Sequence, residues 1–286
     1  MSKATYQLNL PKNRTTNVVF ASPHSGRNYS CAFLRKTVLD EMAVRSSEDA
    51  FVDLLFADVP TFGAPLLLAK TPRAFVDLNR NCDELDPALI EGVRQSSHNA
   101  RIASGLGVIP RVVSNGRAIY RGKLTRVDVE TRLAAHWMPY HTTLETVLEQ
   151  SLQMFGEAIL IDCHSMPHEA VKGTTRRGTR KPEIVLGDRF GATARSDVVD
   201  RVEAAFTRAG LKVVRNAPFA GAYITQRYGR PARHQHAVQI EIDRSLYMNE
   251  RLIRPNGDFQ NFQALISSIA KEITQIGMSE IPLAAE

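Results

Sequence analysis

Short apolar runs rich in β-branched residues alternate with helix-like stretches along this 286-residue chain, and this alternation constrains its fold most strongly. The runs are short enough for buried strands, and the stretches between them have the spacing of amphipathic helices. Strands that alternate with helices predict a layered α/β fold with a mostly parallel or mixed central sheet. The predicted strands are 18–22, 64–69, 74–78, 158–163, 183–186, 211–215 and 236–243, and the predicted helices are 47–59, 126–155, 196–209 and 258–277.

Proline and glycine mark where these elements end or change direction. Pro139 predicts a break that divides the region 126–155 into two helices, and Pro110 predicts an extended segment at 107–113. Residues 168–182 are rich in Gly, Thr, Arg and Lys, which indicates a loop, with a lid as one interpretation. No internal repeat or low-complexity linker divides the chain, so we expect residues 1–286 to form a single domain.

The composition indicates a cytoplasmic protein with a small anionic substrate. Cys31, Cys82 and Cys163 form no CxxC pair, residues 1–17 lack the apolar core of a signal peptide, and no apolar run is long enough to span a membrane. The net charge of +6 suits either nucleic acid or small anions. Because the sequence has no zinc finger and no recognition motif for DNA or RNA, we expect no nucleic-acid partner. The pattern does not predict an oligomeric state.

Two histidines follow predicted strands directly, and they are the first candidates for chemistry. His24 comes after the strand 18–22, and His164 comes after the strand 158–163. Open α/β sheets bind ligands beyond the carboxyl ends of their strands, so the two side chains are expected to hold one metal ion. Glu48 and Asp49 are candidates for a third, carboxylate ligand, and Asp162 is interpreted as support for His164 from the other side of its strand. The alternative is that both histidines only cap their strands by hydrogen bonding.

Two further segments combine strand patterns with charged side chains. Residues 73–81 bring Arg73, Asn79 and Arg80 together, and a guanidinium can bind a carboxylate through two parallel hydrogen bonds. Strand 236–243 places Glu241 on the face opposite its apolar residues, where it is a candidate general base. The alternatives are a surface turn with ordinary salt bridges for the first segment, and a structural salt bridge for Glu241.

Taken together, the segments of this chain resemble the N-formylglutamate amidohydrolase family, which in turn is similar to zinc carboxypeptidases and aspartoacylase-type deacylases. The resemblance implies a three-layer α/β fold of the zinc-carboxypeptidase (phosphorylase/hydrolase-like) type, with a mixed central sheet. The segments that carry it are Ser22-Pro-His-Ser-Gly26, Glu48-Asp-Ala-Phe-Val-Asp53, Phe75-Val-Asp-Leu-Asn-Arg80, Gly105-Leu-Gly-Val-Ile-Pro110, Pro139-Tyr-His141, Asp162-Cys-His-Ser165, Gly187-Asp-Arg189, Ile224-Thr-Gln-Arg-Tyr-Gly-Arg-Pro231 and Gln239-Ile-Glu-Ile-Asp-Arg-Ser-Leu-Tyr247.

The resemblance also implies one Zn²⁺ ion held by two histidines and a carboxylate. His24 and His164 match the histidine positions. The carboxypeptidase pattern has a glutamate three residues after the first histidine, where this chain has Arg27. The resemblance therefore favours Asp49 as the carboxylate ligand, with Glu48 in reserve.

The implied activity is zinc-dependent hydrolysis of the formyl amide of N-formyl-L-glutamate to formate and L-glutamate, as at the end of histidine degradation. Glu241 matches the general base, and Arg73 matches an arginine that stabilises the oxyanion. The residues implied in substrate binding are Asn79 and Arg80, for the α-carboxylate, with Tyr223 and Arg227. The cation for the side-chain carboxylate is left open among Arg177, Arg180, Arg227 and Arg230.

Three other functions remain open at this point. One is the hydrolysis of a different N-acyl amino acid or peptide amide by a metal-dependent enzyme on the same scaffold. The second is a binding protein that has lost the metal, against which the complete set of His24, His164 and Glu241 argues. The third is a basic nucleic-acid binder, which would show a steep salt dependence of binding.

Overall fold

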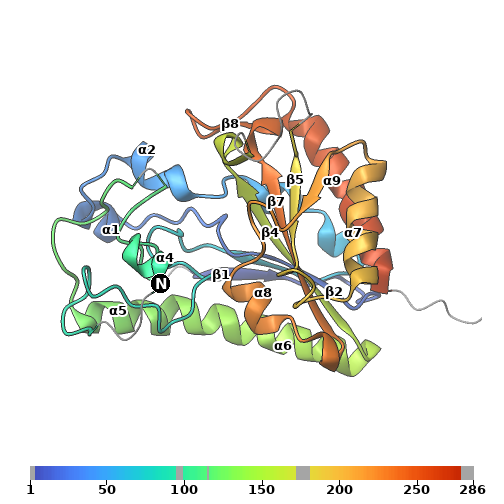
Figure 1. Ribbon diagram of the computed structural model, residues 1–286, viewed down its shortest axis with the longest axis horizontal. Helices are drawn as coiled ribbons and strands as arrows, with labels where there is room; N and C mark the ends of the chain where they lie inside the picture. The colour runs from blue at the N-terminus through green and yellow to red at the C-terminus, as the bar shows by residue number, and fades with distance from the viewer. Residues whose placement is uncertain (1–3, 95–98, 115, 172–180, 278–286) are drawn as a thin grey trace, which may run out of the picture.

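The computed structural model describes residues 4–94, 99–114, 116–171 and 181–277, and its centre is a seven-stranded mixed sheet (Figure 1). The strand order is β1-β3-β2-β4-β7-β5-β6. Strands β3, β2, β4 and β7 run parallel, whereas β1 is antiparallel to β3 and β5 is antiparallel to β7. The strands are β1 (Tyr6–Asn9), β2 (Val18–Ser22), β3 (Leu66–Ala69), β4 (Ala158–Met166), β5 (Ile184–Gly187), β6 (Val213–Arg215) and β7 (Gln235–Asp243), with a separate hairpin of β8 (Met248–Asn249) and β9 (Arg254–Pro255).

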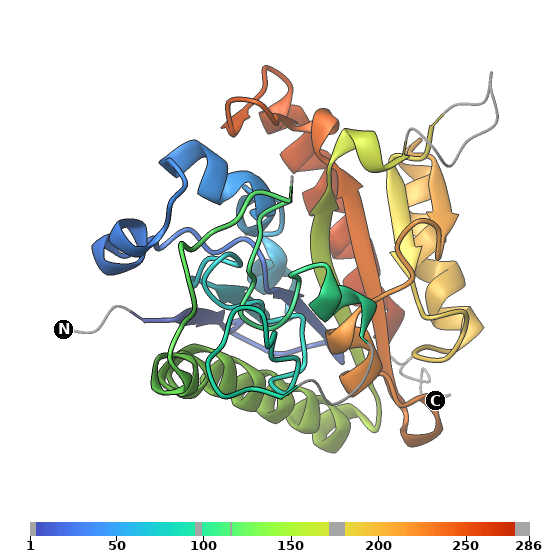
Figure 2. The ribbon, with the colours of Figure 1, turned by 60° about the vertical axis from the view of Figure 1, so that its left-hand side comes forward.

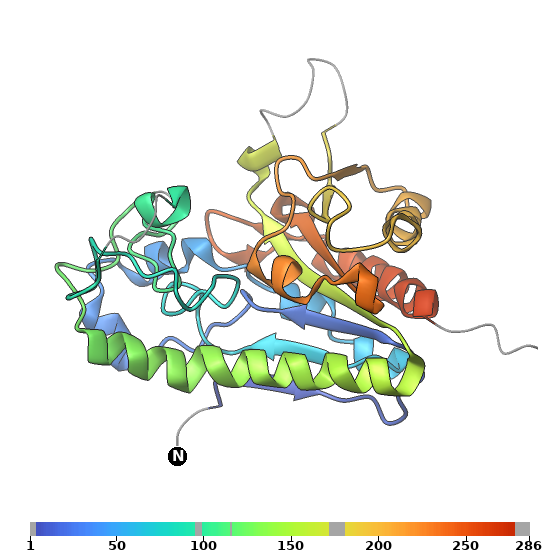
Figure 3. The same ribbon diagram turned by 60° about the horizontal axis from the view of Figure 1, so that its bottom comes forward.

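Helices cover both faces of this sheet, so its central strands are buried on both sides (Figures 2 and 3). Alternate residues of β2 point to opposite faces. Val18 and Phe20 pack with α7 (Ser196–Arg208) and α9 (Phe259–Thr274), whereas Val19 and Ala21 pack with α6 (Met138–Phe155). The helices of the described residues are α1 (Cys31–Lys36), α2 (Glu41–Val44), α3 (Val52–Leu55), α4 (Ala100–Ala103), α5 (Arg126–Arg132), α6 (Met138–Phe155), α7 (Ser196–Arg208), α8 (Tyr223–Tyr228) and α9 (Phe259–Thr274).

The strand predicted at 74–78 is wrong. The backbone turns there, since the amides of Phe75 and Val76 both donate to the carbonyl of Pro72. Val76 and Leu78 are nevertheless buried in the core on the α6 face. The apolar pattern therefore marks burial of an irregular loop, and a loop that turns at its start cannot pair along its length as a strand does.

Two helix predictions also need correction. The helix at 47–59 is divided into short pieces, because Phe51 adopts a left-handed conformation with φ of 67° before α3 begins. The break predicted at Pro139 does not occur, since α5 continues through a π-helical segment, Leu133–Trp137, into α6. We attribute the continuity to the wider π turn before Pro139, which leaves room for the proline ring where a regular helix would clash.

Other elements agree with the sequence-based boundaries or lie outside the described residues. Helices α7 and α9 begin and end within a few residues of the predicted limits, and β4 is longer than predicted because it continues through His164 to Met166. Of the predicted loop 168–182, residues 172–180 lie outside the described part of the chain. Within the described residues, no helix combines the length and the apolar character that a membrane span requires.

Candidate functional site

The carboxyl ends of three neighbouring parallel strands bring the candidate residues to one edge of the sheet. His24 follows the end of β2, whereas His164 lies near the end of β4 and is paired in register with Glu241 of β7. Because β2, β4 and β7 run in the same direction, these three side chains meet at the edge where open α/β sheets bind ligands.

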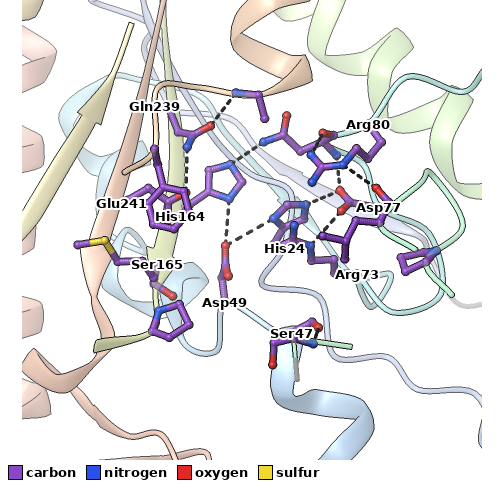
Figure 4. Close-up of a pocket in the computed structure, with 18 of the residues that line it drawn as sticks. His24, Ser47, Asp49, Arg73, Asp77, Arg80, His164, Ser165, Gln239 and Glu241 are labelled. Atoms are coloured by element: carbon purple, nitrogen blue, oxygen red, sulfur yellow. Dashed lines mark hydrogen bonds and ion pairs between the residues drawn. The ribbon is translucent and has the colours of Figure 1, made fainter. Parts of the chain in front are cut away.

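His24, Asp49 and His164 form a buried group with the arrangement of metal ligands (Figure 4). Asp49 Oδ2 lies 3.0 Å from His164 Nδ1 and 3.6 Å from His24 Nδ1, and one ligand atom of each residue lies within 4.8 Å of the others. His24 Nδ1 is buried and has no hydrogen-bond partner in the described protein. A buried nitrogen without a partner is costly unless a ligand satisfies it, and two imidazoles with a carboxylate suit a divalent transition metal.

The backbone around residue 49 decides which of the two adjacent carboxylates enters this group. The amide of Asp49 donates to the carbonyl of His24 over 3.0 Å, which holds residue 49 against the loop after β2. Glu48 points to the opposite side, where it accepts hydrogen bonds from Arg45 and from the hydroxyl of Tyr29. The structure therefore brings Asp49, and not Glu48, to the histidines.

Carboxylates also hold the far side of each imidazole. Asp77 Oδ1 lies 2.7 Å from His24 Nε2, and Asp162 Oδ2 lies 3.1 Å from His164 Nε2 as an ion pair. The prediction that Asp162 lies on the other side of its strand is wrong, because residues 162 and 164 are two apart in β4 and share a face. Carboxylates in such positions fix the ring orientation of metal-binding histidines.

Arg244 and Gln239 position the two acids that face the histidines. The guanidinium of Arg244 donates to Asp49 Oδ1 over 2.9 Å, so that Asp49 Oδ2 is left for the histidines. Gln239 donates to Glu241 Oε1 over 2.8 Å, and its own oxygen accepts the amide of Ala222 over 3.2 Å. Both acids are therefore held in place by fixed donors.

Burial and neighbouring charges shift the pKa of each group at this site. Burial raises the pKa of Glu241 to about 7, although the charge of His164 opposes the shift. Burial alone would also raise the pKa of Asp49 and of Asp77. The histidines outweigh burial at Asp49, and Arg73 with His24 outweighs it at Asp77, so both carboxyl groups have a pKa well below the usual value. The site thus keeps Asp49 and Asp77 ionised and holds Glu241 near the midpoint of its titration at neutral pH.

A cavity of about 380 Å³ opens over these groups. Arg73 lines it and donates to Asp77 Oδ2 over 3.0 Å. Arg80 also lines it, but its guanidinium donates to the backbone oxygens of Leu106 and Asn79. The amide of Asn79 is engaged on both sides, because its nitrogen lies 3.1 Å from His164 Nε2 and its oxygen accepts the amide of Ile224.

The structure does not bring Tyr223 and Arg227 to this cavity. The ring of Tyr223 packs against Trp137 and His141, and Arg227 pairs with Glu145. Their predicted role in substrate binding therefore has no support in the geometry. Of the other arginines considered for the side-chain carboxylate, Arg230 does not line the cavity, and Arg177 and Arg180 lie outside the described residues.

Residues 16–248 match the N-formylglutamate amidohydrolase family. The chain belongs to this family. It is 30% identical to the N-formylglutamate deformylase of Pseudomonas putida and 31% identical to that of Pseudomonas aeruginosa; the alignments cover 82% of this chain and 82% and 83% of the two relatives. The crystal structure of N-formylglutamate amidohydrolase from Ralstonia eutropha JMP134 superposes with a TM-score of 0.89 at 34% identity, over 96% of this chain and 98% of that one.

In this member of the N-formylglutamate amidohydrolase family, the sequence pattern identified the histidines but gave no role to four other residues that line the cavity. Asp77, Gln239 and Arg244 lie inside segments that carried the resemblance, so their place in the sequence was a signal. Their contacts were not predictable, because each has a partner in another part of the chain: His24 for Asp77, Ala222 for Gln239 and Asp49 for Arg244. The fourth residue, Arg101, had no signal, since it lies in a short helix that the pattern did not predict.

Proposed function

We propose that this protein is a zinc-dependent amidohydrolase that cleaves the formyl amide of N-formyl-L-glutamate to formate and L-glutamate. The observation that carries the proposal is the buried group of His24, Asp49 and His164 beside Glu241, under a cavity lined by arginines. Membership of the N-formylglutamate amidohydrolase family and the activity named for two relatives support the same substrate.

The donor set fits one Zn²⁺ ion held by His24, Asp49 and His164. Two nitrogen ligands and one carboxylate oxygen leave a position for water or substrate, as catalytic zinc sites require. The unpartnered Nδ1 of His24 faces Asp49, so the protein presents a ligand atom that nothing else satisfies. When bound there, Zn²⁺ supplies Lewis-acid chemistry, which polarises an amide carbonyl and makes water acidic enough to attack it near neutral pH.

The chain's own residues then have separate roles in the hydrolysis. Glu241 accepts a proton from the attacking water and later donates it to the amide nitrogen as the C–N bond breaks. Gln239 holds Glu241 in the orientation for both transfers. Arg73 stabilises the oxyanion that develops on the formyl oxygen, and Arg80 binds the α-carboxylate at the cavity wall.

The finer features of the fold and setting are proposals of the same kind. We infer a three-layer arrangement of the zinc-carboxypeptidase type, supported by the helices on both faces of the mixed sheet. The single domain over residues 1–286, the cytoplasmic location and the absence of a nucleic-acid partner rest on the sequence patterns alone, and the role in histidine degradation rests on the family resemblance.

Metal removal and reloading test the proposal directly. We expect chelator-treated protein to lose the release of formate and glutamate from N-formyl-L-glutamate, and stoichiometric Zn²⁺ to restore it. Reloaded protein that releases no formate would overturn the proposed substrate, whereas full activity after complete removal of metal would overturn the metal dependence.

Replacing Glu241 by Gln separates an enzyme from a binding protein. The substitution is nearly isosteric, so we expect normal folding and normal zinc content by elemental analysis. Because the variant lacks the proton acceptor, kcat should fall by about 10²–10⁴-fold. A variant with kcat within a few-fold of wild type would show that another group accepts the proton. His236, the next candidate from the sequence, does not reach the site, because it lies at the start of β7, contacts Glu157 and does not line the cavity.

One observation favours the hydrolysis of other N-acyl amino acids or peptide amides as a second function. A further cavity of about 750 Å³ adjoins the first, and Ser46, Ser114, Pro167 and Arg244 line both. This second cavity leaves room for an acyl group larger than formyl beyond His24, Asp49 and His164. A panel of N-acyl glutamates distinguishes the two functions, since faster cleavage of a longer acyl chain than of formyl would favour the second.

A further inference from the structure

The cavity over His24, Asp49 and His164 is lined by more positive than negative side chains. Four arginines line it, together with the carboxylates of Asp49, Asp77 and Glu241. Two of the arginines are neutralised inside the protein, because Arg73 pairs with Asp77 and Arg244 pairs with Asp49. The remaining two, Arg80 and Arg101, make no ion pair within the described residues and are left for an incoming ligand.

The backbone after α4 connects Arg80 to Arg101 through Leu106. The amide of Leu106 donates to the carbonyl of Arg101 over 2.8 Å, and Arg80 Nε donates to the carbonyl of the same Leu106 over 3.0 Å. Asn99 caps α4 by accepting the amide of Arg101 over 2.9 Å, which fixes the start of this segment. Burial lowers the pKa of Arg80, as do the nearby charges of Arg73 and Arg101, although the charge of Asp77 opposes the shift. Leu106 therefore links the two arginines, and all three residues line the cavity.

The two arginines differ in depth, as two successive anionic groups of one ligand would require. Arg80 is buried beside Asn79 and the histidines, whereas Arg101 is exposed at the mouth of the cavity (Figure 4 shows Arg80). A buried guanidinium that makes no ion pair is costly to the folded protein, and a ligand carboxylate within hydrogen-bond distance would offset that cost. One carboxylate would neutralise Arg80 and leave Arg101 free.

We propose that Arg101 determines the specificity of this site for dicarboxylic N-acyl amino acids, by binding the side-chain carboxylate while Arg80 binds the α-carboxylate. The proposal rests on the function proposed above and deepens it, since it names the residue that recognises the acidic side chain. Of the four arginines considered from the sequence, Arg227 and Arg230 do not line the cavity, and Arg177 and Arg180 lie outside the described residues.

Arg101→Gln, tested on two substrates, isolates this role. We expect kcat/KM for N-formyl-L-glutamate to fall about 10- to 100-fold, the range for losing a charge-assisted hydrogen bond. With N-formyl-L-glutamine, whose side chain is neutral, kcat/KM should stay within a few-fold of wild type. Arg94→Gln is the matched control, because it removes the same charge from an exposed position that does not line the cavity. An equal loss on both substrates, or no loss on N-formyl-L-glutamate, would overturn the proposal.

Calorimetry with L-glutamate and L-glutamine keeps this test separate from the proposed reaction. If wild-type protein cleaves no N-formyl compound, the proposed function fails, but tighter binding of glutamate than of glutamine that disappears in Arg101→Gln would still support the role of Arg101. If zinc-loaded wild-type protein prefers neither member of each pair, in turnover or in binding, the role of Arg101 is wrong whatever reaction the protein catalyses.

Discussion

At the residue scale, His24 and His164 each present one ring nitrogen to Asp49 and the other to a second carboxylate. Asp77 holds His24 and Asp162 lies against His164, so both rings are fixed before any metal binds. Asp49 in turn divides its oxygens between Arg244 and the histidines. This arrangement predicts that metal affinity depends on groups that never contact the metal.

Asp77→Asn tests that dependence. Asparagine keeps the shape of the side chain but removes the charge that orients His24, so we expect the Kd for zinc to rise by about 10- to 100-fold in a chelator competition assay. Asp77 also pairs with Arg73, and the control must reproduce that loss. Asp53→Asn also removes an aspartate that pairs with an arginine, Arg27, and no contact of Asp53 with either histidine is present in the described structure, so it should leave the Kd unchanged. Equal affinities in the two variants would refute the prediction.

At the element scale, the central strands were predictable from the sequence, because β2 and β4 are continuous apolar runs and β7 alternates apolar with polar residues, whereas the edge strand β1 was not predicted. Strands β2, β4 and β7 all begin close to their predicted limits. The predicted carboxyl ends of these strands pointed to His24, His164 and Glu241 as candidate site residues. The predicted strand at 74–78 and the break at Pro139 were wrong, since an apolar pattern does not distinguish a buried loop from a strand, and a proline does not reveal a π turn before it. Arg101 and Arg244 were unassigned because their positions depend on long-range packing.

The loop after β2 illustrates a requirement that only the packed elements reveal. A Cβ atom added at Gly26 would lie 2.1 Å from the carbonyl oxygen of Thr71, so the loop that carries His24 packs against the backbone after β3. We expect Gly26→Ala to lower the free energy of unfolding by about 1–3 kcal/mol or more, measured by denaturant titration. Gly257→Ala is the control, because no atom lies within 4 Å of its added Cβ. Similar unfolding midpoints for both variants would contradict this packing.

At the scale of the whole molecule, the site forms only when distant parts of the chain are folded together. Its side chains come from positions between 24 and 244, and the loop of Asn79 must dock on both β4 and α8. His141 of α6 joins the same parts, because its Nε2 lies 2.9 Å from the carbonyl oxygen of Leu78 and its Nδ1 lies 2.9 Å from the hydroxyl of Tyr228 in α8. The hydrogen bonds of His141 therefore contribute to the free energy of unfolding of the whole protein.

We predict that His141 makes global stability depend on pH. Burial lowers its pKa to about 3, so below the usual value of about 6.5 the unfolded chain binds a proton that the folded protein does not. This contribution to the free energy of unfolding is complete above pH 6.5 and is lost as the pH falls towards 3, by up to about 1.4 kcal/mol per pH unit. His141→Gln removes the titrating group, so the difference between wild type and variant, measured by denaturant titration of metal-free protein between pH 4 and 8, should shrink steadily below pH 6.5. A difference that stays constant across this range would show that His141 is protonated as easily in the folded protein as in the unfolded chain.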